Sequence, residues 1–213
     1  MNTEPSPIPS SATAAHWDRV YARGATQVSW YQSTPSMSLE IIRSLAPSPD
    51  AAIVDVGGGA SWLAAALLDQ GFQDLTVLDV SPAALEMSQA QLGPLAPRVN
   101  WLRQDVLLWS PARSYQLWHD RAVFHFLVDP RSRARYVEAL ERGLGKGGRL
   151  ILGVFAPDGP SQCSGLPVAR FDAAGLAAEL GPGFAPLNAW TEQHATPDGG
   201  CQAFTWAAFQ RRD

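Results

Sequence analysis

Three glycines and two acidic residues follow the ends of apolar runs, and together they suit the binding of a nucleotide. Gly57-Gly58-Gly59 comes directly after the apolar run 51–56, Asp79 ends the next run, and Asp105 follows a third. Glycines at such a turn let a ligand approach the backbone, and a helix beginning there offers free N–H groups. Asp79 lies 20 residues after Gly59, where a carboxylate can accept both hydroxyls of a ribose. Asp105 could receive an adenine amino group. A tight turn without a ligand is the alternative for the glycines alone.

The elements that position these residues alternate between short apolar runs and helical patterns from residue 51 onward. We predict strands over 51–56, 75–78, 99–102, 115–119 and 149–155, helices over 61–70, 81–92 and 131–144, and a turn over 145–148. Strands separated by helices indicate a parallel sheet, and right-handed crossovers then place helices on both faces. The glycines and acids would therefore meet at one edge of a Rossmann-like, doubly wound α/β sheet.

The C-terminal part of the chain predicts a different arrangement. A short helix over 172–180, capped by Asp172, precedes strand-like runs at 185–190 and 202–209, which a turn-rich segment joins. Such a pair forms an antiparallel hairpin at a sheet end. Residues 1–15, rich in Ser, Pro and Ala, predict a disordered tail. We expect a single domain over 16–213, with a cap segment at 16–50 and a core at 51–213.

Composition excludes several classes of function. The formal net charge of −4 argues against a protein that binds nucleic acid through a broad basic surface. Two cysteines cannot form a disulfide framework, and no Cys/His cluster has zinc spacing, so no metal is expected. No apolar run reaches the roughly 20 residues that span a bilayer, and the N-terminus does not resemble a secretion signal. We expect a cytoplasmic protein that binds no membrane. Its oligomeric state stays open.

A dinucleotide ligand fits the loop less well. In a Gly-x-Gly-x-x-Gly fingerprint that starts at Gly57, the third glycine would fall on Trp62, and an indole conflicts with close helix–strand packing. An NAD(P)-dependent oxidoreductase therefore stays only as an alternative.

The segment Asp55-Val56-Gly57-Gly58-Gly59, followed by Asp79 and Asp105, resembles the cofactor site of the class I S-adenosylmethionine-dependent methyltransferases. The resemblance covers residue 51 to the C-terminus and implies a small single-domain member with seven strands in the order 3-2-1-4-5-7-6, the last strand antiparallel. Ser61 departs from the family pattern, because many members have glycine there. The resemblance implies these cofactor-binding residues: Asp55, Gly57, Gly58 and Gly59 for the methionine part, Asp79 and Val80 for the ribose, and Asp105 and Val106 for the adenine.

The segment before the sheet is rich in aromatic residues. Its Trp17-Asp18-x-x-Tyr21 start is similar to small methyltransferases with an N-terminal cap helix, including members that act on thiols or on lysine. Aromatic rings can cover the sulfonium cation of the cofactor, so Trp30 joins the candidate cofactor residues, and Trp17, Tyr21 and Tyr31 could contribute. These rings could instead simply pack the cap onto the sheet.

The end of the fourth predicted strand would face the methyl acceptor. Asp120-Arg121-Ala122 stands where one branch of protein-lysine methyltransferases has Asp-Lys-Gly, and His125 stands near that branch's second Asp. A histidine suits a base for a thiol or hydroxyl better than a site for an amine. Our candidate catalytic residues are Asp120, His125 and His119. A core histidine at 125, and a helix cap or ion pair at 120, are the structural alternatives.

Two later loops supply candidate substrate contacts. The polar loop 155–170 carries Cys163 and Arg170, and His194 could converge from the C-terminal hairpin. We therefore expect a methyltransferase that works by in-line displacement on a small molecule or a protein lysine, catalysed mainly by proximity and orientation. A catalytically inactive regulatory protein that still binds the cofactor is the first alternative. The acceptor atom, whether nitrogen, oxygen, sulfur or a metalloid, stays undetermined.

Overall fold

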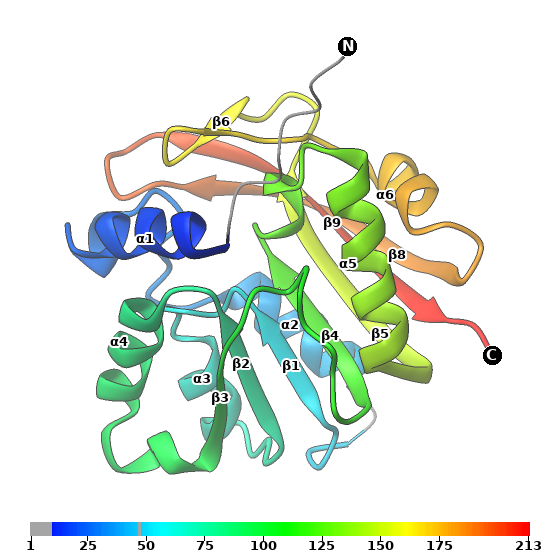
Figure 1. Cartoon of the computed structure of the whole chain (residues 1–213), viewed down its shortest axis with the longest axis horizontal. Helices are drawn as coiled ribbons and strands as arrows, with labels where there is room; N and C mark the ends of the chain where they lie inside the picture. Colours follow the sequence, from blue (N-terminus) through cyan, green and yellow to red (C-terminus); the bar gives the residue numbers. More distant parts are fainter. Residues whose placement is uncertain (1–9, 47) are drawn as a thin grey trace.

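The computed structural model describes residues 10–46 and 48–213, which form one seven-stranded sheet flanked by helices (Figure 1). The strands of this sheet are β1 (Ile53–Val56), β2 (Leu75–Asp79), β3 (Val99–Arg103), β4 (Tyr115–Arg121), β5 (Leu144–Phe155), β8 (Phe184–Ala195) and β9 (Cys201–Arg211). Their order is β3-β2-β1-β4-β5-β9-β8, and β9 runs antiparallel to both of its neighbours. The predicted fold class, strand order and antiparallel last strand are therefore confirmed.

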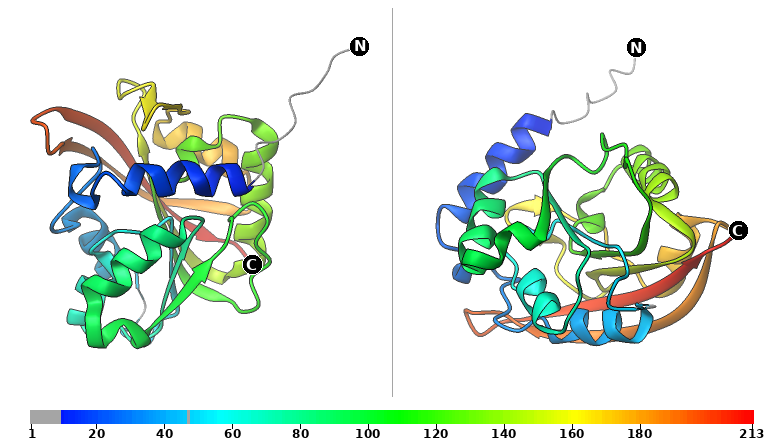
Figure 2. Two further views of the ribbon diagram at one scale, coloured as in Figure 1. Left: turned by 60° about the vertical axis from the view of Figure 1, so that its left-hand side comes forward. Right: turned by 90° about the horizontal axis from the view of Figure 1, so that it is seen from below.

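Helices cover both faces of the sheet, as the alternating pattern predicts. The helices are α1 (Ser10–Tyr21), α2 (Ser36–Leu45), α3 (Leu63–Asp69), α4 (Pro82–Leu92), α5 (Pro130–Gly143) and α6 (Ala173–Leu180), with 3₁₀ turns η1 (Ala25–Gln27), η2 (Gly93–Arg98) and η3 (Phe124–Phe126). α2, α3 and α4 pack on one face, and α5 and α6 pack on the other (Figure 2). α1 lies against α4, across the carboxyl ends of the parallel strands (Figure 1).

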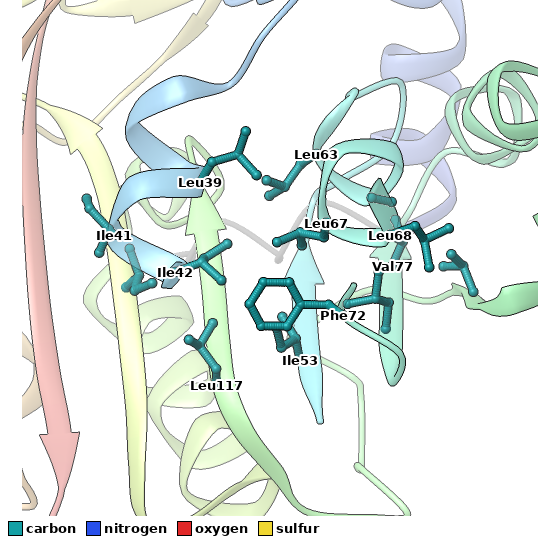
Figure 3. Close-up of a cluster of buried hydrophobic side chains, with 14 of the residues drawn as sticks. Leu39, Ile41, Ile42, Ile53, Leu63, Leu67, Leu68, Phe72, Val77 and Leu117 are labelled. Atoms are coloured by element: carbon teal, nitrogen blue, oxygen red, sulfur yellow. The ribbon is translucent and has the colours of Figure 1, made fainter. Parts of the chain in front are cut away.

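Each face of the sheet has its own apolar core. On the first face, α2 contributes Ile41 and Ile42 and α3 contributes Leu67, and these pack on Ile53 of β1 and Leu117 of β4 (Figure 3). The buried strands β1 and β2 have no exposed residue, which is typical of a parallel sheet covered on both sides. Packing on both faces fixes β1, β2 and β4 side by side, so their carboxyl ends meet at one edge of the sheet.

The second face contains a buried polar chain inside its apolar core. The Trp118 indole N–H donates to the Tyr136 hydroxyl at 2.9 Å, and that hydroxyl donates to Asp120 Oδ2 at 2.7 Å. Val123 N donates to Asp120 Oδ1 at 2.9 Å. The chain thereby ties α5 to the end of β4 and to the turn that follows it.

Local capping signals place the helix starts. Ser81 accepts a hydrogen bond from Ala84 N, with Pro82 at the first position of α4, and Asp172 accepts one from Gly175 N at the start of α6. Both caps agree with the predicted helix starts.

The structure corrects the sequence-based boundaries in the N-terminal region. The prediction of a disordered tail over 1–15 is wrong for residues 10–15, which form the first part of α1, whereas residues 1–9 lie outside the described residues. The segment contains three alanines, and alanine has the highest helix propensity. The cap therefore starts at α1 and also contains α2.

Two corrections concern the second half of the chain. The glycine cluster 145–148, predicted as a turn, lies inside β5 as a bulge, because Tyr115 pairs with Leu144 while Leu117 pairs with Arg149. The loop after β5 contains a small hairpin, β6 (Gln162–Cys163) and β7 (Leu166–Pro167), that the sequence analysis missed. None of the helices in the described part of the chain combines the length and hydropathy that crossing a bilayer requires.

The buried polar chain on the second face gives a first prediction. Tyr136→Phe should lower the free energy of unfolding by about 1–3 kcal/mol, because it removes the partner of a buried indole and of a buried carboxylate. Urea denaturation followed by circular dichroism measures this loss. The control is Tyr115→Phe, since Tyr115 is buried in the same core but its hydroxyl takes no part in this hydrogen-bonded chain; its effect should stay within about 0.5 kcal/mol. Equal losses in both variants would contradict the proposed role of the chain.

Candidate active site

A small cavity lies under the N-terminal cap, at the carboxyl ends of β1 and β4. Its volume is about 50 Å³. Its walls come from the end of α1, the cap segment, α2, the glycine loop and the end of β4; they include Tyr21, Trp30, Tyr31, Ser38, Asp55, Gly57, Gly58, Ser61, His119 and Arg121. The cavity lies where the strand order reverses between β1 and β4, the usual ligand position in an open α/β sheet.

The glycine loop wraps tightly around two acidic side chains. Gly57 has a φ of +71°, which disfavours any residue with a side chain. A Cβ atom at Gly58 would lie 2.2 Å from Asp55 Oδ2, and one at Gly59 would lie 2.5 Å from Asp79 Oδ2. These glycines therefore allow both carboxylates to lie directly under the loop.

Asp79 is a buried carboxylate that accepts hydrogen bonds from the backbone. Its Oδ2 accepts from Gly59 N at 3.0 Å and its Oδ1 accepts from Ser81 N at 2.8 Å. Burial is the main cause that raises the pKa of Asp79, to about 6, and the charge of Asp55 adds to the effect. A carboxylate has about four lone-pair positions, so Asp79 retains capacity for hydroxyl donors.

Asp18 of α1 connects the cap to this part of the core. The Ser81 hydroxyl, which caps α4, donates to Asp18 Oδ1 at 2.6 Å. The cap aromatics contact one another: the centroid of the Trp30 ring lies 5.8 Å from that of Trp17 and 6.2 Å from that of Tyr21. Tyr21 and Trp30 line the cavity, whereas Trp17 contacts the ring of Phe126 behind them.

Gly59 and Asp79 are not among the residues that line the cavity, and the remaining predicted cofactor residues also lie outside it. Asp105 is half-buried after β3 and accepts a hydrogen bond from Leu107 N at 2.9 Å. Val106 packs into the core of the second face, and Val80 is half-buried after Asp79. The structure thus brings Asp55, the glycines and Asp79 together, and it places Asp105 and Val106 at the neighbouring strand end.

His119 forms a buried hydrogen-bonded chain at the wall of the cavity. Its Nδ1 lies 2.7 Å from Asp55 Oδ1, and its Nε2 lies 3.0 Å from the hydroxyl of Ser38 in α2. Asp55 and His119 are direct partners in the parallel register of β1 and β4. With a proton on Nδ1 donated to Asp55, Nε2 is left as an acceptor, which is the arrangement a general base requires. Ser38 was not a candidate, because it lies 81 residues from His119.

The other two catalytic candidates have structural roles instead. Asp120 is fully buried on the opposite face of the sheet, where burial raises its pKa to about 6 and its oxygens accept from Val123, Phe124 and Tyr136. His125 is fully buried, and its Nδ1 accepts from Phe155 N at 3.4 Å. Burial, with the charge of Arg121, lowers the pKa of His125 to about 3. Such a histidine stays neutral and is a poor base at neutral pH.

Arg121 is a site residue that the sequence analysis did not select. It ends β4 and lines the cavity, and its Nη1 donates to the backbone oxygen of Trp30 at 3.0 Å. It was missed because its partner, the Trp30 backbone, lies 91 residues away in the sequence.

The three predicted substrate residues do not converge on one site. Cys163 is buried, and burial raises the pKa of its thiol to about 11, so the reactive thiolate is disfavoured. Arg170 is exposed and donates to the Gly159 backbone oxygen at 3.1 Å. His194 is buried, with Nε2 2.8 Å from the Ser29 backbone oxygen, and it lines an open groove between the cap and β8.

The sequence matches a family model described as "Methyltransferase domain" over residues 53–148, which include the glycine loop, Asp79 and the end of β4. This segment of the chain is a methyltransferase domain of the class I, S-adenosylmethionine-dependent type. Members of this family use S-adenosylmethionine as cofactor.

Individual relatives of this methyltransferase are distant. The eEF1A lysine and N-terminal methyltransferase of Mus musculus is 22% identical over 153 residues, which are 71% of this chain and 22% of that protein. The chain thus spans about a fifth of the length of that curated relative.

Two solved structures share the fold over nearly the whole chain. A methyltransferase from Anabaena variabilis has a TM-score of 0.77 at 19% identity and covers 99% of this chain and 98% of its own. The 1,6-didemethyltoxoflavin-N1-methyltransferase of Burkholderia thailandensis has a TM-score of 0.70 at 19% identity. The match covers 100% of this chain and 94% of that protein's chain.

The residues of this methyltransferase fit the cofactor. The Asp79 carboxylate accepts two backbone hydrogen bonds and so retains lone pairs that ribose hydroxyls could use. Gly57 and Gly58 line the cavity, where the methionine part would lie. Tyr21 and Trp30 present aromatic rings to the cavity, where a sulfonium cation would be stabilised.

The environment of Asp79 gives a second prediction. Its raised pKa means that the carboxylate becomes protonated as the pH falls through about 6. Ribose hydroxyls bind best to the ionised form, so the affinity for S-adenosylhomocysteine should drop about tenfold from pH 7 to pH 5, as expected when one such group must ionise. Asp79→Asn should weaken binding by about 1–3 kcal/mol and remove this pH dependence.

Isothermal titration calorimetry at pH 5, 6 and 7 measures both effects. Asp74→Asn is the matched control, because Asp74 is a carboxylate at the surface that pairs with Arg113. An Asp79→Asn variant that keeps a native circular dichroism spectrum and full affinity would remove Asp79 from the cofactor site.

Proposed function

We propose that the chain transfers the methyl group of S-adenosylmethionine to a small-molecule acceptor. The observation that carries this proposal is the enclosure of the site: the aromatic cap residues Tyr21, Trp30 and Tyr31 cover the cavity at the ends of β1 and β4. A side chain of a folded protein would have to pass this cover while attached to its own backbone. A small acceptor can instead be enclosed completely, which suits a site under a cap.

The comparisons support the same choice. The Burkholderia thailandensis structure, which matches the whole chain, is described with bound 1,6-didemethyltoxoflavin and S-adenosylhomocysteine. The relative that acts on the lysine of a protein is several times longer than this chain, and it matches only in part.

The chemistry of the transfer requires few protein groups. When bound, S-adenosylmethionine supplies an electrophilic methyl carbon, whose bond to sulfur breaks as a lone pair of the acceptor bonds to that carbon. The electron pair of the broken bond stays on sulfur. The protein must hold the acceptor in line and exclude water, which is catalysis by proximity and orientation.

We assign the role of base to His119, which the sequence analysis had proposed together with Asp120 and His125. Asp55 orients its ring through Nδ1, and His119 and its Nε2 partner Ser38 both line the cavity. An acceptor hydroxyl or thiol would give its proton to Nε2 after the Ser38 hydroxyl has rotated away. Asp55 then stabilises the imidazolium that forms.

The test starts with binding and continues with transfer. Calorimetric titration with S-adenosylmethionine and S-adenosylhomocysteine should give micromolar binding of both, with NADH as the control for the oxidoreductase alternative. Incubation with methyl-labelled S-adenosylmethionine and either the small-molecule or the protein fraction of a cell extract should place the label in the small-molecule fraction.

Label confined to protein would overturn the proposed acceptor class. Cofactor binding with no label in either fraction would favour the inactive regulatory protein. Binding of NADH alone would favour the oxidoreductase.

A variant of His119 tests the assignment of the base. His119→Gln should reduce the turnover number about 100-fold or more, the lower range of general-base contributions, and should change the affinity for S-adenosylhomocysteine little. His16→Gln is the matched control, because His16 lies on α1 and does not line the cavity. Equal turnover in both variants would exclude His119 as the base.

A further inference from the structure

The guanidinium of Arg121 is a buried cation that forms no ion pair with any residue the structure describes. Its Nη1 donates to the Trp30 backbone oxygen, and its Cζ lies 4.9 Å from the centroid of the Phe204 ring. Within residues 10–46 and 48–213, its Nε and Nη2 atoms are buried and have no hydrogen-bond partner. Buried polar atoms are nearly always paired, and an unpaired buried charge is strongly destabilising, so this one needs an explanation.

The neighbouring acidic side chains are occupied elsewhere. Asp55 contacts His119, and Glu192 accepts hydrogen bonds from Gln32 at 3.1 Å and from the Trp206 indole at 2.8 Å. Their charges favour the protonated guanidinium, but neither carboxylate lies within ion-pair distance of Arg121. Among the described residues, the Nε–Nη2 edge of Arg121 therefore has no direct carboxylate partner at the end of β4.

The neighbouring histidines are uncharged and therefore neither pair with the guanidinium nor repel it. The pKa of His125 and the pKa of His194 are both lowered, mainly by burial and secondly by the charge of Arg121. Both rings are therefore held in the neutral form and add no charge beside the guanidinium.

The two unpaired atoms lie on one edge of the guanidinium. Nε and Nη2 present parallel N–H groups, and this edge matches the two oxygens of a carboxylate in a bidentate pair. Phe204 lies on β9, beyond β5, whereas Asp79 lies on β2 at the other side of β1. The guanidinium is therefore on the side of the site away from the predicted ribose position.

We propose that Nε and Nη2 of Arg121 bind a carboxylate of the methyl acceptor, so that the substrate is a small organic acid. The inference rests on the proposed function and specifies its substrate class. A sulfonium and a guanidinium at one buried site favour an anionic ligand by direct charge attraction, which is strong where water is excluded. The same two charges disfavour the ammonium group of a protein lysine.

A carboxylate could also come from the methionine part of the cofactor. The experiment separates the two sources with ligands that differ in this group, because 5′-methylthioadenosine shares the adenosine and sulfur of S-adenosylhomocysteine but lacks the carboxylate. The variants are Arg121→Met, which keeps length and packing, and Arg121→Lys, which keeps the charge without the bidentate edge. Arg142→Gln on α5 is the control, an exposed arginine on the other face of the sheet.

Calorimetry first measures S-adenosylhomocysteine and 5′-methylthioadenosine with each protein, and circular dichroism checks each fold. The complex with S-adenosylhomocysteine is then titrated with aromatic and aliphatic carboxylates and their amides, including benzoate with benzamide and nicotinate with nicotinamide. We expect at least one carboxylate to bind the wild type at least tenfold more tightly than its amide does. Arg121→Met should lose this preference, Arg121→Lys should keep part of it, and Arg142→Gln should keep all of it.

Three other results have distinct meanings. In the first, Arg121→Met weakens the binding of S-adenosylhomocysteine at least tenfold and leaves the binding of 5′-methylthioadenosine unchanged; Arg121→Lys serves instead if Arg121→Met does not fold. Arg121 then binds the cofactor, and the proposal is overturned. If no carboxylate in the series binds the wild type better than its amide, the proposal is also overturned. If the wild type binds neither adenosyl ligand, the proposed function itself fails.

Discussion

The parallel pairing of β1 with β4 is the constraint on which the whole site depends. Register places Asp55 beside His119 and Val56 beside Asp120. Because side chains alternate across a strand, Asp55 and His119 lie on the cap side of the sheet and Asp120 lies on the α5 side. One residue of register shift would exchange these positions. The apolar cores on both faces prevent such a shift, since it would move buried residues to the wrong side.

The α5 side has its own task, which is to fix the turn after β4. Asp120 receives hydrogen bonds from Val123 and Phe124 in that turn. Ala122 between them has a φ of +70°, a strained conformation for a residue with a Cβ atom, and its N donates to the Gly153 backbone oxygen at 2.8 Å. Such strain persists only where the surroundings over-determine it. The buried chain that ends at Asp120 therefore holds Arg121 at the edge of the cavity, so the acid acts on the site indirectly.

The sequence predicts the fold and the meeting of Asp55, the glycines and Asp79 at one sheet edge, but it does not predict the contacts around the end of β4, for a physical reason. Strands, helix caps and the glycine loop are local patterns, and the resemblance that starts from Asp55 and Asp79 lies on consecutive strand ends. The acceptor side depends on contacts between distant segments, such as Ser38 with His119 or Arg121 with the Trp30 backbone, 91 residues away. Burial of His125 likewise depends on strands that follow it. No local pattern carries this information.

The cap sets a further condition on function. A cavity of about 50 Å³ is far below the roughly 300–1,000 Å³ of small-molecule sites, so the cap must move before the cofactor can enter. Its segment after α1 is attached by a few polar contacts, including His194 and Gln202 to Ser29 and Gln32 to Glu192, on the exposed β8–β9 hairpin side. Hydrogen bonds of this kind each contribute only about 0.5–1.5 kcal/mol, but the ring of Trp30 also packs against the apolar core of the first face. The cap that excludes water during transfer must therefore give up both kinds of contact in order to open.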